Sequence, residues 1–167
     1  MYGGLARILL LTKNSLLSFT VFETHNQSVK SPCTGADMPT RILVVEDEPY
    51  LQEYLSVVLT DYGYQVSLCA DGVEALNELL MQHIPDLLLT DIKMPRMSGM
   101  QLIEICHQSF PRLPMVVCSG YLDPWQIEKL QSRGVGFIQK PFYEKDLVNV
   151  IENSLRNIWN SWGAQQE

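Results

Sequence analysis

Between Arg41 and Trp159 the chain alternates five short apolar runs with five stretches of helical periodicity. The apolar runs occupy residues 42–45, 65–70, 86–91, 115–119 and 134–138. Runs that are apolar almost throughout are typical of strands that are buried on both faces of a parallel sheet. Parallel neighbours need crossover helices between them, so the alternation predicts a doubly wound α/β domain with a five-stranded parallel sheet and helices on both faces.

Sequence signals mark the helix boundaries. Pro49 suits the first turn of a helix and Gly63 is a typical stop, and together they bound the first helix. The last helix is predicted to run from about Glu144 to Trp159, because its apolar residues recur at three- and four-residue steps. The other three helices begin at recognisable N-terminal signals, which are Asp71 with Glu74, Ser98 with Gln101, and Asp123 with Pro124.

Residues 1–38 differ in character from the segment that follows. Their apolar start contains Arg7, Lys13 and Asn14. It is therefore too short for a membrane span of roughly 20 apolar residues, and it lacks the apolar core of a secretory signal. We expect this segment to be a weakly ordered N-terminal extension, or to lie upstream of a true translation start at Met38.

Length and composition fit a single folded domain. The 167 residues are 46% hydrophobic, which is enough for one well-buried core and leaves little room for a second. The domain is assigned to residues 39–160, and residues 161–167 form a short tail. No helix-turn-helix or catalytic module fits after Trp159, so we expect the output of the protein to be a separate partner protein.

Charge and cysteine content narrow the possible functions. The formal net charge is −7 and no cluster of Lys and Arg is visible, which argues against a surface that binds nucleic acid. The four cysteines are far apart and form neither a CxxC pair nor a zinc-ligand spacing with the histidines. We therefore expect reduced thiols in a cytoplasmic protein without a structural metal.

Polar side chains follow four of the five predicted strands. They are Glu46 and Asp47 after the first strand, Asp91 after the third, Ser119 after the fourth and Lys140 after the fifth. Each is weak evidence by itself, because acidic and hydroxyl residues are common in turns and caps. The carboxyl ends of parallel strands share one edge of the sheet, where ligands bind in such folds. We therefore expect one pocket with three carboxylates, one hydroxyl and one ammonium.

This combination predicts a magnesium-dependent phosphoryl site. Three carboxylates in one small site disfavour each other's ionisation unless a cation neutralises them. Mg²⁺ is the expected cation, because it binds few carboxylates and leaves positions for phosphate oxygens. Asp91 is a competent nucleophile toward phosphorus and would form an acyl phosphate. Lys140 and Ser119 can contact the phosphoryl oxygens.

Four motifs resemble the receiver domains of two-component response regulators, in the order and near the spacings of that family: ILVVEDEP, LLLTDIKMPRMSG, VVCSG and FIQKPF. The resemblance covers nearly all of residues 41–159. It implies a single-domain receiver with a flavodoxin-like sheet of strand order 2-1-3-4-5. It also implies that Asp91 is phosphorylated by a histidine kinase or a histidine phosphotransfer protein. The implied Mg²⁺ ligands are Glu46, Asp47, Asp91 and the backbone carbonyl of Lys93.

The resemblance further implies a conformational switch. Ser119 and Phe137 would form the switch pair, in which the hydroxyl moves toward the phosphoryl group and the ring turns inward. Plain core packing is the alternative role for Phe137. Lys93 and Tyr121 occupy variable positions that in the family flank the path of the hydrolysing water. We hypothesise that the bulk of Tyr121 slows self-dephosphorylation.

Two departures from the family pattern are visible, and neither breaks the site. Glu46 is one methylene longer than the aspartate that often stands first in the acidic pair, which suits a metal bound through water. Gly120 replaces the alanine that is common after the switch hydroxyl, and it leaves space beside the phosphoryl group.

Other functions fit these residues less well. A module that binds a flavin phosphate needs a first loop rich in Ser, Thr and Gly, whereas residues 46–49 are Glu-Asp-Glu-Pro. An aspartyl-phosphate hydrolase typically has a second acid two residues after its nucleophile, where this chain has Lys93. A pseudo-receiver that only binds proteins is the remaining alternative, although every chemical position is filled.

No motif identifies the partner that reads the signal. Aromatic side chains in the last two helices and the loop between them could contact it, namely Trp125, Phe142, Tyr143 and Trp159. Packing among the last helices is the alternative role for these rings. A phosphorelay intermediate, a stand-alone regulator of a partner protein and a homodimer through this face are all compatible with the sequence.

Overall fold

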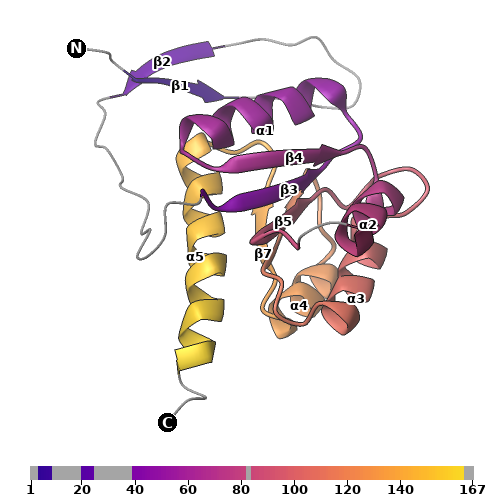
Figure 1. Cartoon of the computed structure of the whole chain (residues 1–167). Helices are drawn as coiled ribbons and strands as arrows, with labels where there is room; N and C mark the ends of the chain where they lie inside the picture. The colour runs from indigo at the N-terminus through magenta and orange to yellow at the C-terminus, as the bar shows by residue number, and fades with distance from the viewer. Residues whose placement is uncertain (1–3, 9–19, 25–38, 82–83, 164–167) are drawn as a thin grey trace.

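The computed structural model describes residues 4–8, 20–24, 39–81 and 84–163. Its centre is a five-stranded parallel sheet between two layers of helices (Figure 1). The strands of this sheet are β3 (Arg41–Val45), β4 (Gln65–Cys69), β5 (Leu87–Thr90), β6 (Met115–Ser119) and β7 (Gly136–Gln139). The helices are α1 (Pro49–Asp61), α2 (Gly72–Met81), α3 (Gly99–Ser109), α4 (Pro124–Ser132) and α5 (Glu144–Gly163).

The strands lie in the order β4-β3-β5-β6-β7, and every neighbouring pair is parallel. Since β3 is the first of these strands along the chain, the expected order 2-1-3-4-5 is confirmed. The chain leaves β3 toward β4 on one side and later returns to β5 on the other side. The loops that follow β3 and β5 therefore diverge, which is the arrangement that forms a ligand crevice at the carboxyl edge of such sheets.

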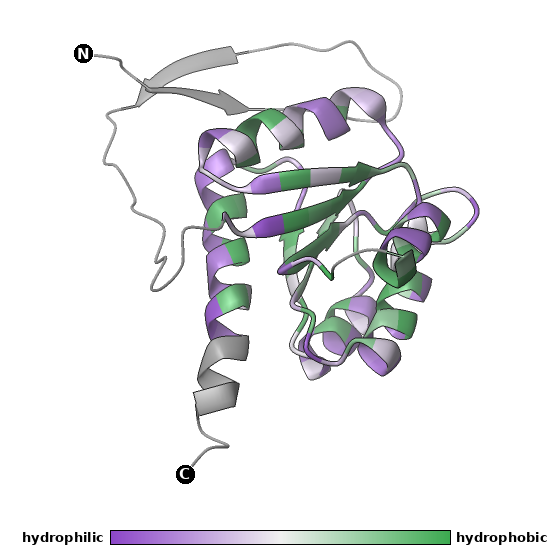
Figure 2. Cartoon of the chain, viewed as in Figure 1, coloured by the Kyte–Doolittle hydropathy of each residue, from purple (hydrophilic) through white to green (hydrophobic). Residues whose placement is uncertain are grey.

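Alternate strand residues pack on opposite faces of the sheet. In β3, Ile42 and Val44 belong to the half of the core covered by α1 and α5, whereas Leu43 and Val45 belong to the half covered by α2, α3 and α4. In Figure 2 the inner strands are largely green, while the helices change between green and purple along their length. Helix α1, for example, buries one stripe, which consists of Leu51, Leu55, Val58 and Leu59.

Three of the expected helix-start signals form capping bonds, and at α4 the N–H of Asp123 donates to Gln126 Oε1 at 2.8 Å. At α3, Ser98 and Gln101 make the reciprocal bonds of a capping box. At α2, the Asp71 carboxylate accepts a hydrogen bond from the backbone N–H of Glu74 at 3.1 Å. The Glu74 carboxylate accepts from the N–H of Ala70 at 2.9 Å instead of that of Asp71. The box at α2 is therefore displaced by one residue from the expected pattern.

The last helix is longer than expected, and the described part of residues 1–38 contains two strands. α5 continues to Gly163 instead of ending near Trp159, so residues 161–163 of the expected tail are helical. Within residues 1–38, β1 (Gly4–Ile8) and β2 (Thr20–Thr24) pair as an antiparallel sheet separate from the central one. The remainder of residues 1–38, the side chains of residues 158–163 and residues 164–167 lie outside the described part of the chain.

Three of the cysteines lie within the described residues, and all three are buried free thiols. They are Cys69, Cys106 and Cys118. Burial raises the pKa of the Cys69 and Cys106 thiols to about 11. These thiols therefore stay neutral at physiological pH and pack as small apolar side chains.

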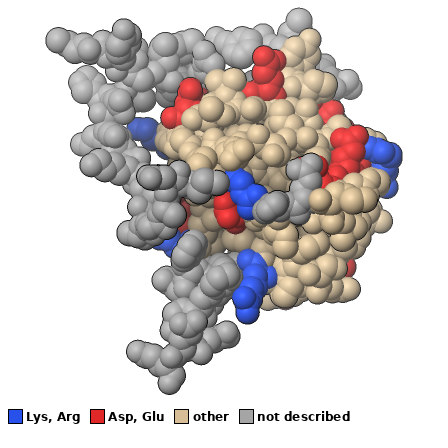
Figure 3. Space-filling view, in the orientation of Figure 1, with Lys and Arg blue, Asp and Glu red and all other residues tan. Residues whose placement is uncertain are grey.

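Acidic and basic side chains are mixed on the surface. On the face seen in Figure 3, the described Lys and Arg side chains are separated from one another instead of gathering in one patch. Glu104 of α3 lies 2.8 Å from Arg133 and 3.0 Å from Lys129, which joins α3 to α4. These partners lower the pKa of Glu104 to about 2. Among the described helices, none combines the length and apolar content required to cross a membrane.

Candidate functional site

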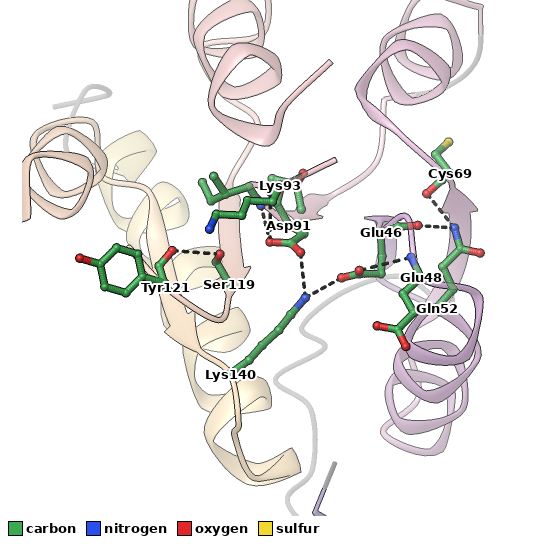
Figure 4. A network of polar contacts seen from close by, with 11 residues as sticks. Glu46, Glu48, Gln52, Cys69, Asp91, Lys93, Ser119, Tyr121 and Lys140 are labelled. Atoms are coloured by element: carbon green, nitrogen blue, oxygen red, sulfur yellow. Dashed lines mark hydrogen bonds and ion pairs between the residues drawn. The ribbon is translucent and has the colours of Figure 1, made fainter. Parts of the chain in front are cut away.

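The loops that follow β3, β5 and β7 are held at one edge of the sheet. Backbone hydrogen bonds extend the parallel ladder beyond the strands: Glu46 N donates to Cys69 O at 3.1 Å, Asp91 N to Val45 O at 3.0 Å, and Lys140 N to Ser119 O at 2.9 Å. The main chain of a neighbouring strand thus fixes each polar residue. Figure 4 shows that the side chains of Glu46, Asp91 and Lys140 point toward one another.

The Lys140 ammonium lies between two carboxylates. Its Nζ is 2.8 Å from Glu46 Oε2 and 3.1 Å from Asp91 Oδ2 (Figure 4). The three side chains are 12%, 4% and 9% exposed, in the order Lys140, Glu46 and Asp91. Water therefore screens these contacts much less than it screens an ion pair on the surface.

Burial and charge act in opposite directions on this cluster. Burial raises the pKa of Glu46, and the Asp91 charge adds to the rise, while Lys140 partly offsets it. Burial disfavours the Lys140 charge, but the attraction of Glu46 and Asp91 outweighs this effect and holds the pKa of Lys140 above its ordinary value. Lys140 is therefore cationic at neutral pH, and its charge stabilises the two buried carboxylates.

The acidic group fits a divalent cation. Glu46, Asp47 and Asp91 each offer one carboxylate oxygen, and these oxygens lie within 4.8 Å of one another. Three negative charges against the single positive charge of Lys140 leave a formal charge of −2 at the site. Carboxylate oxygens are the hard ligands that Mg²⁺ prefers, and a divalent ion would balance the remaining charge. The donor set present here is therefore suited to Mg²⁺.

Both carboxylate oxygens of Asp91 have partners. Oδ1 accepts hydrogen bonds from the backbone N–H of Ile92 at 2.5 Å and of Lys93 at 3.4 Å, while Oδ2 faces Lys140. The loop that follows β5 therefore binds the acid that precedes it. Lys93, whose carbonyl is among the expected metal ligands, lies beside Asp91 in Figure 4.

Two residues that shape the site were not predicted. The side-chain amide of Gln52 donates to Glu46 O at 2.7 Å and to Cys69 O at 2.9 Å, which joins the acidic loop to the end of β4. Gly99 begins α3 against Asp91, and a Cβ there would lie 1.9 Å from the Asp91 main-chain oxygen. A glutamine beside an apolar stripe carries no signal, but a glycine directly after an N-cap serine can indicate a close backbone approach.

The expected switch residues are Ser119, the last residue of β6, and Phe137 in β7. Ser119 is buried, and its hydroxyl donates to the main-chain oxygen of Tyr121 at 3.3 Å (Figure 4). Tyr121 itself is 58% exposed. Phe137 is partly buried and packs on the half of the core that α2, α3 and α4 cover. The structure thus brings Glu46, Asp47, Asp91 and Lys140 together and binds the Ser119 hydroxyl within its own loop.

The aromatic residues expected at a partner surface fall into two groups. Trp125 and Tyr143 are 57% and 56% exposed. Phe142 is buried among the core residues under α1 and α5, so the packing alternative holds for this ring. The side chain of Trp159 lies outside the described part of the chain.

Comparison with solved structures assigns this sheet to the CheY-like class of α/β domains. A CheY-like response regulator receiver domain protein from Methanospirillum hungatei JF-1 is 27% identical with a TM-score of 0.69, over 74% of this chain and 99% of that chain. NtrX from Brucella abortus is 28% identical with a TM-score of 0.69, over 77% of this chain and 29% of that chain. The sequence pattern of the response regulator receiver domain matches residues 42–152. The chain belongs to the response regulator receiver domain family, as its motifs predict.

Relatives in this family include transcriptional regulators. The virulence transcriptional regulatory protein PhoP of Salmonella typhimurium is 34% identical over 128 residues, which are 75% of this chain and 55% of PhoP. The transcriptional regulatory protein PdtaR of Mycobacterium tuberculosis is 36% identical over 126 residues, which are 72% of this chain and 60% of PdtaR. The chain thus spans between half and two thirds of the length of these relatives.

Proposed function

We propose that the protein accepts a phosphoryl group on Asp91 from the phosphohistidine of a histidine kinase or a histidine phosphotransfer protein, in a reaction that requires Mg²⁺. The buried charge cluster is the observation that carries this proposal. Lys140 bridges Glu46 and Asp91, and Asp47 completes an acidic group with a net charge that suits a divalent ion. Such a site can hold a cation and then an anionic phosphoryl group beside it.

The transfer needs little covalent chemistry from the protein. A carboxylate oxygen of Asp91 attacks phosphorus while the bond from phosphorus to the donor imidazole nitrogen breaks. The electron pair of that bond stays on the imidazole, and Asp91 becomes an acyl phosphate. Lys140 moves from its carboxylate partners to a phosphoryl oxygen. Glu46, Asp47, Asp91 and the Lys93 carbonyl would hold Mg²⁺, which supplies charge neutralisation at the phosphoryl oxygens.

Phosphorylation would then change the region around Ser119. Its hydroxyl exchanges the Tyr121 carbonyl for a phosphoryl oxygen, and the Phe137 ring turns inward behind it. The face formed by α4, β7 and α5, with Trp125 and Tyr143 exposed on it, would contact a downstream protein or a second copy of the chain. In this proposal the protein is a cytoplasmic signalling receiver that catalyses only its own phosphorylation and dephosphorylation.

Intact mass after incubation with a small phosphodonor and Mg²⁺ tests the phosphoacceptor. The parent is expected to gain the mass of one phosphoryl group, and Asp91→Asn is expected to gain none because its side chain lacks the nucleophilic carboxylate. Asp61→Asn removes an exposed carboxylate of α1 and should keep the full gain. Omitting Mg²⁺ should abolish the mass gain of the parent. No gain in the parent, or an equal gain in Asp91→Asn, would favour a protein-interaction module that is not phosphorylated.

The lifetime of the phosphoryl group tests the role of Tyr121. If the ring limits the approach of water to the acyl phosphate, Tyr121→Ala should shorten the lifetime several-fold. The decay of the phosphorylated mass after removal of the donor measures this rate. Tyr143→Ala is the matched control, because Tyr143 is 56% exposed against 58% for Tyr121 but precedes α5 in the chain. An unchanged lifetime in Tyr121→Ala would refute the hypothesis.

A further inference from the structure

One side chain ties the loop between β5 and α3 to the start of α2. Arg96 lies in this loop, and its guanidinium contacts two carboxylates. Its Nε and one terminal nitrogen contact Asp71 Oδ2, and the same terminal nitrogen is 3.0 Å from Glu74 Oε1. Three residues earlier, the N–H of Lys93 contacts Asp91. A single short loop thus binds the phosphoacceptor at one end and α2 at the other.

The acid that binds Arg96 is itself firmly held. Asp71 is 3% exposed. Its second oxygen, Oδ1, accepts hydrogen bonds from the backbone N–H of Val73 at 2.8 Å and of Glu74 at 3.1 Å in the first turn of α2. Asp71 cannot shift without breaking these bonds, so the loop is attached to a rigid part of the fold.

The backbone of the loop also approaches α2 closely. A Cβ at Gly72 would lie 2.8 Å from Met97 Cγ and 2.9 Å from the Met97 carbonyl oxygen. Arg96 has a φ of 59°, which is the left-handed region that non-glycine residues adopt only where their surroundings hold them. The carboxylate contacts of Arg96 supply such a restraint at the point where the loop is closest to α2.

We propose that Arg96 is a positioning residue of the metal site. By clamping the loop to α2, it holds the main-chain carbonyl of Lys93 and the N–H groups of the loop beside Asp91. Arg96 itself touches neither the metal nor the phosphoryl group. This inference rests on the proposed function, because it concerns the geometry of the ligands that Mg²⁺ would use.

Electrostatics alone predicts the opposite effect for the loss of Arg96. Removing one positive charge and releasing two carboxylates makes the potential near the site more negative, which should tighten the binding of a cation. A positioning role predicts weaker binding, because the Lys93 carbonyl is no longer held in place. The direction of the change in affinity therefore distinguishes the two effects.

A magnesium titration of the full chain, followed through the backbone amide NMR signals of Asp91 and its neighbours, measures this change. Arg96→Ala is expected to raise the Mg²⁺ concentration at half saturation about threefold to tenfold. Loss of a residue that hydrogen-bonds a metal ligand typically weakens metal binding roughly 10–100-fold, so the expected effect lies at or below the lower end of that range. Arg96→Lys should be intermediate, since one ammonium cannot fork over both carboxylates. At saturating Mg²⁺ the phosphorylation rate of Arg96→Ala should approach that of the parent.

Two further variants test whether the change in Mg²⁺ affinity arises from the contact between Arg96 and Asp71. Asp71→Asn keeps an oxygen for the capping bonds but loses the charge that binds Arg96, so it should weaken Mg²⁺ binding to a similar extent. The double variant should bind no more weakly than either single variant, because both changes break one contact. Arg156→Ala removes the same charge from an exposed position on α5 and should leave the affinity unchanged.

The outcomes separate this inference from the proposed function. If Arg96→Ala binds Mg²⁺ with an affinity equal to or higher than that of the parent, the positioning role of Arg96 is wrong. The phosphoacceptor proposal would remain intact. Unfolding in urea without Mg²⁺ is a second measurement. If Arg96→Ala is less stable than the parent but its folded form binds Mg²⁺ with unchanged affinity, the positioning role of Arg96 is also wrong. No Mg²⁺-dependent shift in the parent would overturn both proposals.

Discussion

Gly99→Ala is expected to destabilise the protein by about 3 kcal/mol or more, at the upper end of the range for overpacked substitutions. A Cβ at this position would lie 1.9 Å from the main-chain oxygen of Asp91 and 3.1 Å from Ile92 Cα. Both are backbone atoms, so no side-chain rotation relieves the clash. The start of α3 must move away from the end of β5, which strains the 3.0 Å hydrogen bond from Gly99 N to Ile92 O.

Urea unfolding of the parent and the variant measures this loss. Gly120→Ala is the matched control, because nothing lies within 4 Å of a Cβ at that position, and it should be close to the parent in stability. The folded fraction of Gly99→Ala should also accept phosphate far more slowly, since the displacement moves Asp91. Equal stability of the two variants would show that α3 and the Asp91 carbonyl do not require this close approach.

Lys140→Met is expected to lower the rate of phosphorylation about a hundredfold or more, which is the typical effect of removing one group that stabilises developing charge. Methionine keeps much of the length of the side chain, so the change removes a charge more than a volume. Without Mg²⁺ the variant should also lose about 3 kcal/mol of stability, because Glu46 and Asp91 are then buried without a counter-charge.

Mg²⁺ distinguishes the two effects of Lys140→Met. Added Mg²⁺ should restore much of the stability, since it replaces the missing positive charge, but it should not restore the rate. Mass-monitored phosphorylation and urea unfolding, each with and without Mg²⁺, measure the two effects. Lys145→Met, in an exposed position at the start of α5, is the control and should match the parent in both assays. A metal-free Lys140→Met variant as stable as the parent would contradict the role assigned to the ion pair.

The fold was predictable because its elements have distinct local periodicities. Strands buried on both faces produce short continuous apolar runs, whereas α1 and the other helices produce an apolar residue every three or four positions. The meeting of Glu46, Asp91 and Lys140 was predictable for a related reason. Each follows a parallel strand directly, and the carboxyl ends of those strands lie at one edge of the sheet.

Contacts that depend on how the elements are placed in space could not be predicted in this way. Arg96 meets Asp71 across 25 positions in the sequence, and no local pattern distinguishes it from other arginines in exposed loops. The need for glycine at residue 99 depends on the distance between α3 and β5. The burial of Phe142 depends on the path of the chain from β7 into α5, and helical periodicity does not show that path.

The two halves of the hydrophobic core lie on opposite faces of the sheet, and within the described residues they have no buried side chain in common. Phe137 belongs to the same half as Leu130 of α4, whereas the inward residues of α1 and α5 belong to the other. A rotation of the Phe137 ring would therefore alter the packing beneath α4 first. Helices α1 and α5, on the other face, would keep their positions. Motion that begins at Asp91, the proposed phosphoacceptor, would thus be asymmetric across the sheet.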